Sequence, residues 1–124
     1  KLAMNLQISL LALSLSEGIM LTKKAGFDPE KFLEILNSTY FSTGMSQNKA
    51  FKMIKDDYQP TFTLKNMKKD LDTIIASAKD FDAKLPIAES ANEIYRRALD
   101  AGFGEIDYTG ILAYIKKLSE PKNL

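Results

Sequence analysis

The sequence predicts an all-α fold, a compact bundle of about six helices that begins with one long helix. Apolar residues recur at three- and four-residue spacing along most of the chain, as they do on one face of a helix. Turn and capping residues divide this pattern into segments of helical length. No segment keeps the alternation of apolar and polar residues that is typical of a strand.

Local signals place the helices of the first half in chain order. The first helix is expected over residues 2–24 and ends before Gly26, because glycine adopts the positive φ of a helix C-terminus. Asp28 and Pro29 begin a short second helix, with Asp28 as its cap and Pro29 at the first helical position. A third helix is expected over residues 45–54.

The second half of the chain carries the strongest amphipathic pattern. After the polar segment 55–62, one helical stripe consists of Leu64, Met67, Leu71, Ile74, Ala78 and Phe81. Pro86 begins the next helix, whose shared face consists of Ile87, Ala91, Ile94, Tyr95 and Ala98. Gly102 and Gly104 end that helix, and Asp107 is placed to cap a last one.

Composition restricts the chemistry that the chain can perform. Its 124 residues suit one domain, and 45% hydrophobic with 27% charged residues is ordinary for a globular protein. The chain has neither Cys nor His, so it lacks thiolates, the usual general base and the usual zinc ligand. Proton transfer is left to Lys, Asp, Glu or Tyr, and no metal site is predicted.

The opening stretch has the length of a membrane span, about 20 residues. Polar residues interrupt it at Asn5, Gln7, Ser9, Ser14, Ser16 and Glu17. No cleavage site for a signal peptide follows it either. We therefore expect a helix that is buried on most sides within a soluble protein, with no membrane partner.

Four-residue spacing places Lys1, Asn5, Ser9 and Ser16 on one side of this helix, with Ala12 between them. In one interpretation the stripe faces water or allows close helix packing, which is the commoner case. In the other, Lys1 and Asn5 line a cleft, Lys1 as proton donor or acceptor and Asn5 as an orienting hydrogen-bonding group.

A second candidate lies on the helix after residue 63. Lys69 is about 200° around the helix from Leu71, so it points away from the apolar stripe, and by itself this describes a solvated face. Lysines also gather between residues 49 and 69, but aspartates are interleaved with them. With a net charge of +1 and no aromatic platform, we predict no nucleic-acid partner.

Four segments in order carry a family resemblance: KLAMN, AGFDPEKFLEIL, FTLKNMKKDLDTI and LPIAESANEIYRRALDAGFGEIDYTGIL. Together they resemble the C-terminal helical domain of the β-hydroxyacid dehydrogenases, the superfamily of 3-hydroxyisobutyrate dehydrogenase and 6-phosphogluconate dehydrogenase. The likeness extends from Lys1 to about Lys117 and is closest to the branch that handles small 3-hydroxy acids and semialdehydes.

The resemblance implies roles for individual residues. Lys1 matches the catalytic acid/base of the family's K-x-x-x-N motif, and Asn5 matches its substrate-binding Asn. Lys69 matches the Lys that approaches the nicotinamide cofactor, Asp70 the Asp that helps to hold this element, and Phe62 the aromatic residue before it. For the matches in the closing segment a structural role is primary: Pro86, Tyr95, Gly102, Gly104 and Asp107.

The resemblance also implies an organisation and an activity. Residues 1–124 would form the C-terminal all-α substrate and dimerisation domain, and the Rossmann domain that binds most of the NAD or NADP is absent from this chain. The whole enzyme would act on a small hydroxy acid or semialdehyde, such as 3-hydroxyisobutyrate, tartronate semialdehyde or glyoxylate. We expect the fragment alone to be inactive, the missing domain to be its partner in cis, a homo-oligomer, and a cytoplasmic location with an organelle left open. The alternative is a non-catalytic helical dimerisation or interaction module.

Overall fold

The computed structural model describes residues 1–121, and within them it contains seven α-helices and no strand. The helices are α1 (Leu2–Lys24), α2 (Pro29–Asn37), α3 (Gly44–Asn48), α4 (Ala50–Ile54), α5 (Leu64–Asp80), α6 (Pro86–Ala98) and α7 (Ile111–Leu118). Two short turns, η1 (Leu99–Phe103) and η2 (Tyr108–Gly110), connect α6 to α7. The predicted all-α class is confirmed.

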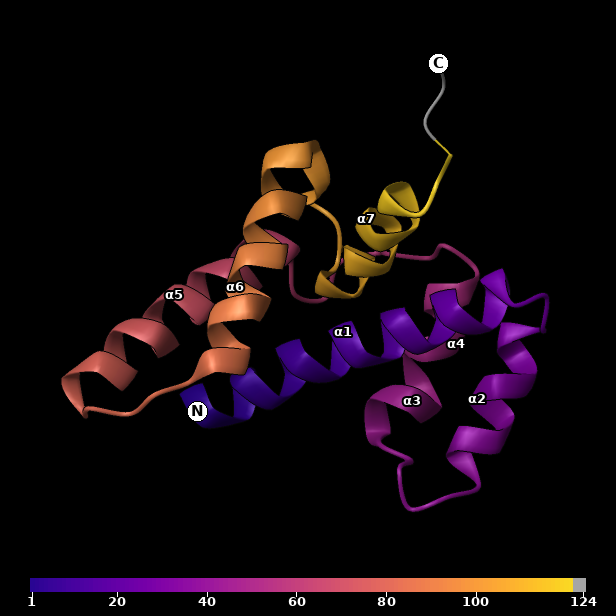
Figure 1. Cartoon of the computed structure of the whole chain (residues 1–124), viewed down its shortest axis with the longest axis horizontal. Helices are drawn as coiled ribbons and strands as arrows, with labels where there is room; N and C mark the ends of the chain where they lie inside the picture. Colours follow the sequence, from indigo (N-terminus) through magenta and orange to yellow (C-terminus); the bar gives the residue numbers. More distant parts are fainter. Residues whose placement is uncertain (122–124) are drawn as a thin grey trace.

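Helix α1 runs through the middle of the molecule, and the other helices lie along its two sides (Figure 1). Its first half packs with α5, α6 and α7 around one group of buried side chains, which includes Met67, Leu71 and Tyr95. Its second half packs with α2, α4 and α7 around another group, which includes Leu33 and Met53. One long helix therefore contributes to both halves of the core.

Small side chains allow the other helices to approach α1 closely. Ser9, Ala12 and Ser16 are each 0% exposed, so this part of the polar stripe packs inside the domain instead of facing water. The Tyr95 hydroxyl on α6 donates a hydrogen bond to the Ser9 carbonyl oxygen at 3.0 Å. At Gly18 an added Cβ would lie 2.9 Å from the Phe32 ring of α2.

The helix bounds agree with the local signals in most places. Helix α1 has the predicted bounds, and the Asp28 carboxylate caps α2 by accepting a hydrogen bond from the backbone N–H of Glu30 at 3.0 Å. Gly102, with φ of +97°, lies in η1, the turn that ends α6. By length and composition α1 could cross a membrane, and 39% of its most apolar stretch is buried within the domain.

Three expectations were wrong in detail. The helix predicted over residues 45–54 is divided at Lys49 into α3 and α4, and α3 begins at Gly44, where Thr43 and Ser46 form a capping box. Phe81 is 84% exposed and Ile87 is 67% exposed, although the stripe pattern placed both in the core. Phe81 directly follows the last residue of α5, and Ile87 is the second residue of α6.

Candidate functional site

The first turns of α1 and the middle of α5 meet at a polar contact. The Asn5 side-chain amide donates a hydrogen bond from Nδ2 to Oδ2 of Asp70 at 2.7 Å. Both residues are half-buried. Lys1 lies one turn before Asn5 on the same face of α1, is exposed, and has no side-chain hydrogen bond or ion pair within residues 1–121. The fold therefore brings three of the predicted site residues to one end of α1.

Lys69 directly precedes Asp70 on α5 and is exposed, as its angular position predicted. Lys65, one turn earlier, and Thr73, one turn later, are exposed on the same side. Lys68 pairs with Asp72 at 2.5 Å, whereas the Lys69 ammonium has no ion-pair partner in the described part of the chain. The exposed Lys69 ammonium therefore places a positive charge next to the Asn5–Asp70 contact, and such a charge attracts anions.

Phe62 lies elsewhere, at the beginning of α5. It is half-buried, and its ring packs edge-to-face against Tyr108 with centroids 6.4 Å apart. From the helical rise, the first residue of α5, Leu64, lies about 9 Å along the helix from Asp70, and Phe62 precedes it. The structure thus places Phe62 as a packing residue beside the start of α5 and does not bring it to Asn5.

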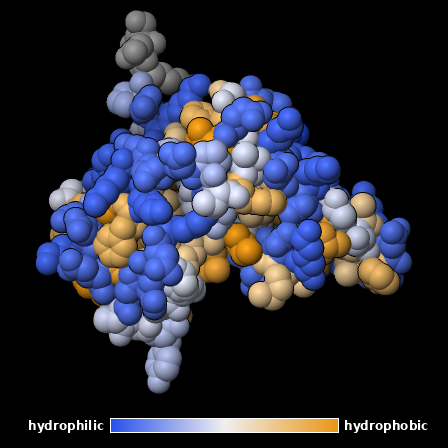
Figure 2. All heavy atoms as spheres, turned by 180° about the vertical axis from the view of Figure 1, so that it is seen from behind, coloured by the Kyte–Doolittle hydropathy of each residue, from blue (hydrophilic) through white to orange (hydrophobic). Residues whose placement is uncertain are grey.

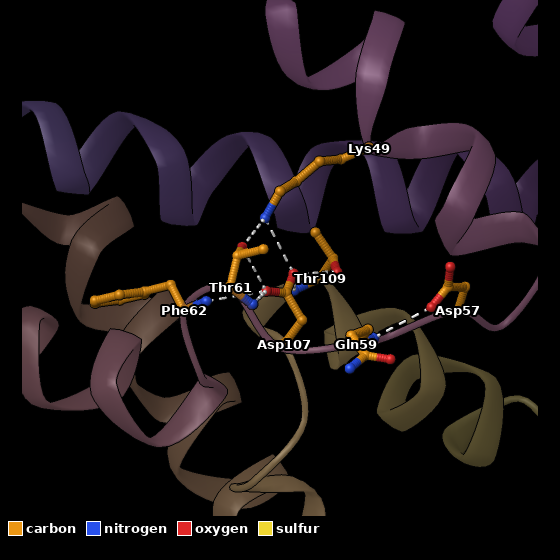
Figure 3. A network of polar contacts seen from close by, with 7 residues as sticks. All are labelled: Lys49, Asp57, Gln59, Thr61, Phe62, Asp107 and Thr109. Carbon is orange, nitrogen blue, oxygen red and sulfur yellow. Dashed lines mark hydrogen bonds and ion pairs between the residues drawn. The ribbon is translucent and has the colours of Figure 1, made fainter.

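Asp107 fixes the segment that leads into α5 (Figure 3). Its side chain is 4% exposed, and its Oδ1 accepts hydrogen bonds from the backbone N–H groups of Thr61 at 3.0 Å and Phe62 at 3.2 Å. Its Oδ2 accepts from the Thr109 hydroxyl at 2.6 Å and pairs with the Lys49 ammonium at 3.3 Å. The same carboxylate therefore caps η2, the turn before α7, and orients the backbone at Phe62.

Backbone hydrogen bonds complete this attachment. The first two N–H groups of α5, those of Leu64 and Lys65, donate to the carbonyl oxygens of Ile106 at 2.9 Å and Gly104 at 3.0 Å. They satisfy donors that a helix start otherwise leaves unpaired. The approach is close at Gly104, where an added Cβ would lie 2.6 Å from a Leu99 methyl group. The closing glycine segment thus holds the start of α5 in place.

Burial raises the pKa of Asp107, but its partners outweigh that effect. Hydrogen bonds from Thr109, Thr61 and Phe62, together with the charge of Lys49, hold the pKa of this carboxyl below its ordinary value. The Lys49 ammonium also lies 4.3 Å from the centre of the Tyr108 ring, a cation–π contact. Asp107 is therefore ionised at neutral pH, and it is surrounded by donors.

Sequence reasoning missed two features of this region. The sequence predicted Asp107 as a helix cap. It did not predict the bonds of Asp107 to Lys49 and Thr61, which lie far away in the chain. It also placed Asn5 and Asp70 in separate motifs without predicting their contact. The capping signal after Gly104 could have indicated Asp107 as a junction, whereas no local signal pairs residues that are 65 positions apart.

Surface grooves occur away from this region. One of about 890 Å³ lies between α1, α6 and α7, lined by residues that include Leu13, Glu17, Ile94, Arg97 and Leu118. Hydrophobic residues are also exposed in patches among hydrophilic ones on the face seen in Figure 2. Within residues 1–121, no group of three or more Asp and Glu side chains is placed to hold a metal ion.

A family model described as NAD-binding of NADP-dependent 3-hydroxyisobutyrate dehydrogenase matches residues 1–115. The chain belongs to this family. The matched residues include all those that form the Asn5–Asp70 contact and the Asp107 contacts.

Individual relatives agree with this assignment. Glyoxylate/succinic semialdehyde reductases 1 and 2 of Arabidopsis thaliana are 29% and 31% identical to this family member over 116 residues, which is 94% of its chain. A solved 3-hydroxyisobutyrate dehydrogenase from Salmonella typhimurium shares its fold, with a TM-score of 0.86 at 22% identity over 92% of the chain. The chain spans 40%, 32% and 40% of the lengths of these proteins, respectively.

Proposed function

We propose that this chain is the C-terminal helical part of an NAD(P)-dependent oxidoreductase that acts on a small hydroxy acid or semialdehyde. The observation that carries the proposal is the cluster at the start of α1. Lys1 and Asn5 share one face, and Asn5 is bonded to Asp70, next in sequence to Lys69, which has no ion-pair partner within residues 1–121. Two motifs that are 65 residues apart thus contribute polar groups to one surface, next to the exposed Lys69 ammonium.

Lys1 is the proposed catalytic acid/base. When the hydroxy acid is oxidised, its neutral amine removes the hydroxyl proton, and when the semialdehyde is reduced, its ammonium returns a proton to the carbonyl oxygen. NAD or NADP, when bound, supplies the hydride acceptor or donor. Lys1 is exposed in this chain, and a second domain that covers it would favour the neutral amine, because burial disfavours the charged form.

Lys69 is proposed to attract the anionic substrate or cofactor, since its ammonium is exposed and has no partner in residues 1–121. Asp70 holds Asn5 beside Lys1. Phe62 is proposed to act indirectly, through the position of the α5 start. We propose that a dinucleotide-binding domain outside residues 1–124 decides between NAD and NADP.

The experiment uses the full-length enzyme that contains this chain. Lys1→Met should lower kcat by about 10²–10⁴-fold, the usual contribution of a general acid/base, and leave cofactor affinity unchanged. Lys24→Met is the matched control, because Lys24 is an exposed lysine in the last turn of the same helix. Turnover that survives in Lys1→Met would refute the assignment of Lys1. A dehydrogenase rate from residues 1–124 alone would refute the proposed need for a second domain.

We also propose that the chain self-associates, as the interaction-module alternative requires. Exposed apolar side chains on α1 and α6 favour it, at Met4, Leu21 and Ile87. Light scattering should then report a mass above the 13.9 kDa of one chain. A strictly monomeric mass would remove this second proposal and leave the dehydrogenase proposal standing.

A further inference from the structure

The Asn5–Asp70 contact determines how Asn5 presents its amide group. Within residues 1–121 it is the only side-chain hydrogen bond that joins α1 to α5. At 2.7 Å between Nδ2 and Oδ2, it has the short length of a bond to a charged acceptor. A side chain near a helix end would otherwise rotate freely, so this bond selects one orientation of the amide.

The orientation follows from the chemistry of the two groups. An ionised carboxylate only accepts hydrogen bonds, so the NH₂ side of the Asn5 amide must face Asp70. The carbonyl oxygen Oδ1 is on the other branch of the planar amide and points elsewhere. It accepts no hydrogen bond from residues 1–121, and it is not among the buried polar atoms that lack a partner. Asn5 therefore presents an accessible acceptor.

The donor on the same face is Lys1. Residues four apart on a helix are neighbours, and the lysine side chain carries N–H groups in both its neutral and its charged form. We propose that Asp70 is a positioning residue that turns Oδ1 of Asn5 toward the Lys1 amine, which gives a line of groups Asp70–Asn5–Lys1. The part of this inference that concerns the reaction rests on the proposed function, whereas the amide orientation belongs to this chain alone.

The line assigns each group a part in the proton transfer. In oxidation the substrate O–H bond breaks and its proton forms a bond to Nζ of Lys1, and in reduction that proton leaves Nζ for the carbonyl oxygen. Asn5 and Asp70 neither gain nor lose a proton. In the complete enzyme, Oδ1 is placed to accept one N–H of Lys1, which would leave the remaining side of the nitrogen for the substrate. Because the bond to Asp70 polarises the amide, Oδ1 is a stronger acceptor for the ammonium.

A double-mutant cycle in the full-length enzyme tests this order of action. Asn5→Ala and Asp70→Asn should each lower kcat by about 10–100-fold, the effect of misplacing a reacting group, with a much smaller change in KM for the cofactor. Because Asp70 acts through Asn5, the double variant should lose no more than Asn5→Ala alone. Losses that multiply in the double variant would overturn the line of action.

Side-chain amide NMR tests the orientation in the chain of residues 1–124. Asp70→Asn, which is nearly the same size, should move the Asn5 amide proton signals upfield and leave those of Asn66 in place. Asn66 is a suitable control because it is an exposed amide one turn before Asp70 with no side-chain hydrogen bond in residues 1–121. An Asn5 signal that does not move would overturn the proposal. If Lys1→Met retains turnover, the proposed function fails, while this measurement still reports on the contact.

Discussion

Asp107→Ala should destabilise the domain strongly, because one buried carboxylate serves as acceptor for donors from three segments. The change leaves the backbone N–H groups of Phe62 and Thr109 and the Lys49 ammonium without their acceptor. Removing one partner from a buried, charge-assisted group of this kind costs about 3–5 kcal/mol. Against a total of about 5–15 kcal/mol, that is a large fraction of the free energy of unfolding.

The assay is urea unfolding followed by circular dichroism at neutral pH. With an m-value of about 1.5 kcal/mol/M, the expected loss lowers the midpoint by about 2 M or more. The matched control is Asp28→Ala, which removes an exposed cap that accepts one backbone N–H, and should cost about 1 kcal/mol. If Asp107→Ala lowers stability no more than Asp28→Ala does, the reasoning about this junction is wrong.

The pH dependence provides a second measurement on the same carboxylate. Its pKa is lower in the folded chain than in the unfolded one, so its ionisation stabilises the fold above the unfolded pKa of about 3.9. This contribution is lost as the pH falls below about 4 and through the folded pKa. Asp107→Asn lacks the titration. The difference in free energy of unfolding between this variant and the unchanged chain should therefore shrink as the pH falls below about 4. A difference that stays the same at all pH values would contradict the lowered pKa of Asp107.

Two further changes test the packing around α1 and α7. Tyr95→Phe should lower the free energy of unfolding by about 1 kcal/mol in urea unfolding, because it removes the hydroxyl bonded to the Ser9 carbonyl oxygen. Tyr114→Phe is the control and should cost much less, since Tyr114 is buried but its hydroxyl makes no hydrogen bond within residues 1–121. If the two variants lose the same stability, the hydrogen bond from Tyr95 to Ser9 does not stabilise the fold. Gly110→Ala should cost about 1–3 kcal/mol, because its Cβ would lie 2.2 Å from an isoleucine methyl group, while Gly44→Ala, with nothing within 4 Å, should be tolerated. A stable Gly110→Ala would show that the isoleucine can move aside.

Helix boundaries were the most accurately predicted features, because they depend on residues within one or two turns. Asp28 and Pro29 begin α2 through a cap and a fixed φ, and α1 ends before a glycine with φ of +87°. The break at Lys49 was not predicted, because neither glycine nor proline marks it in the sequence. The apolar pattern alone continued across it.

The candidate site was only partly predictable for the same reason. The motifs placed Lys1 and Asn5 on one face, and Lys69 beside Asp70 on another helix, since these relations follow from the helical repeat. The packing of α1 on α5 decided that Asn5 meets Asp70, and that Phe62 faces Tyr108 instead.

By itself, the sequence determined the helices, their order and the residue types available for chemistry. Only the tertiary structure decided that the stripe of Ser9, Ala12 and Ser16 turns inward, that Asp107 joins three segments, and that two motifs share a hydrogen bond. The physical reason is range. Helical periodicity and caps act over a few residues, whereas a contact between distant residues exists only when whole helices pack in one particular arrangement.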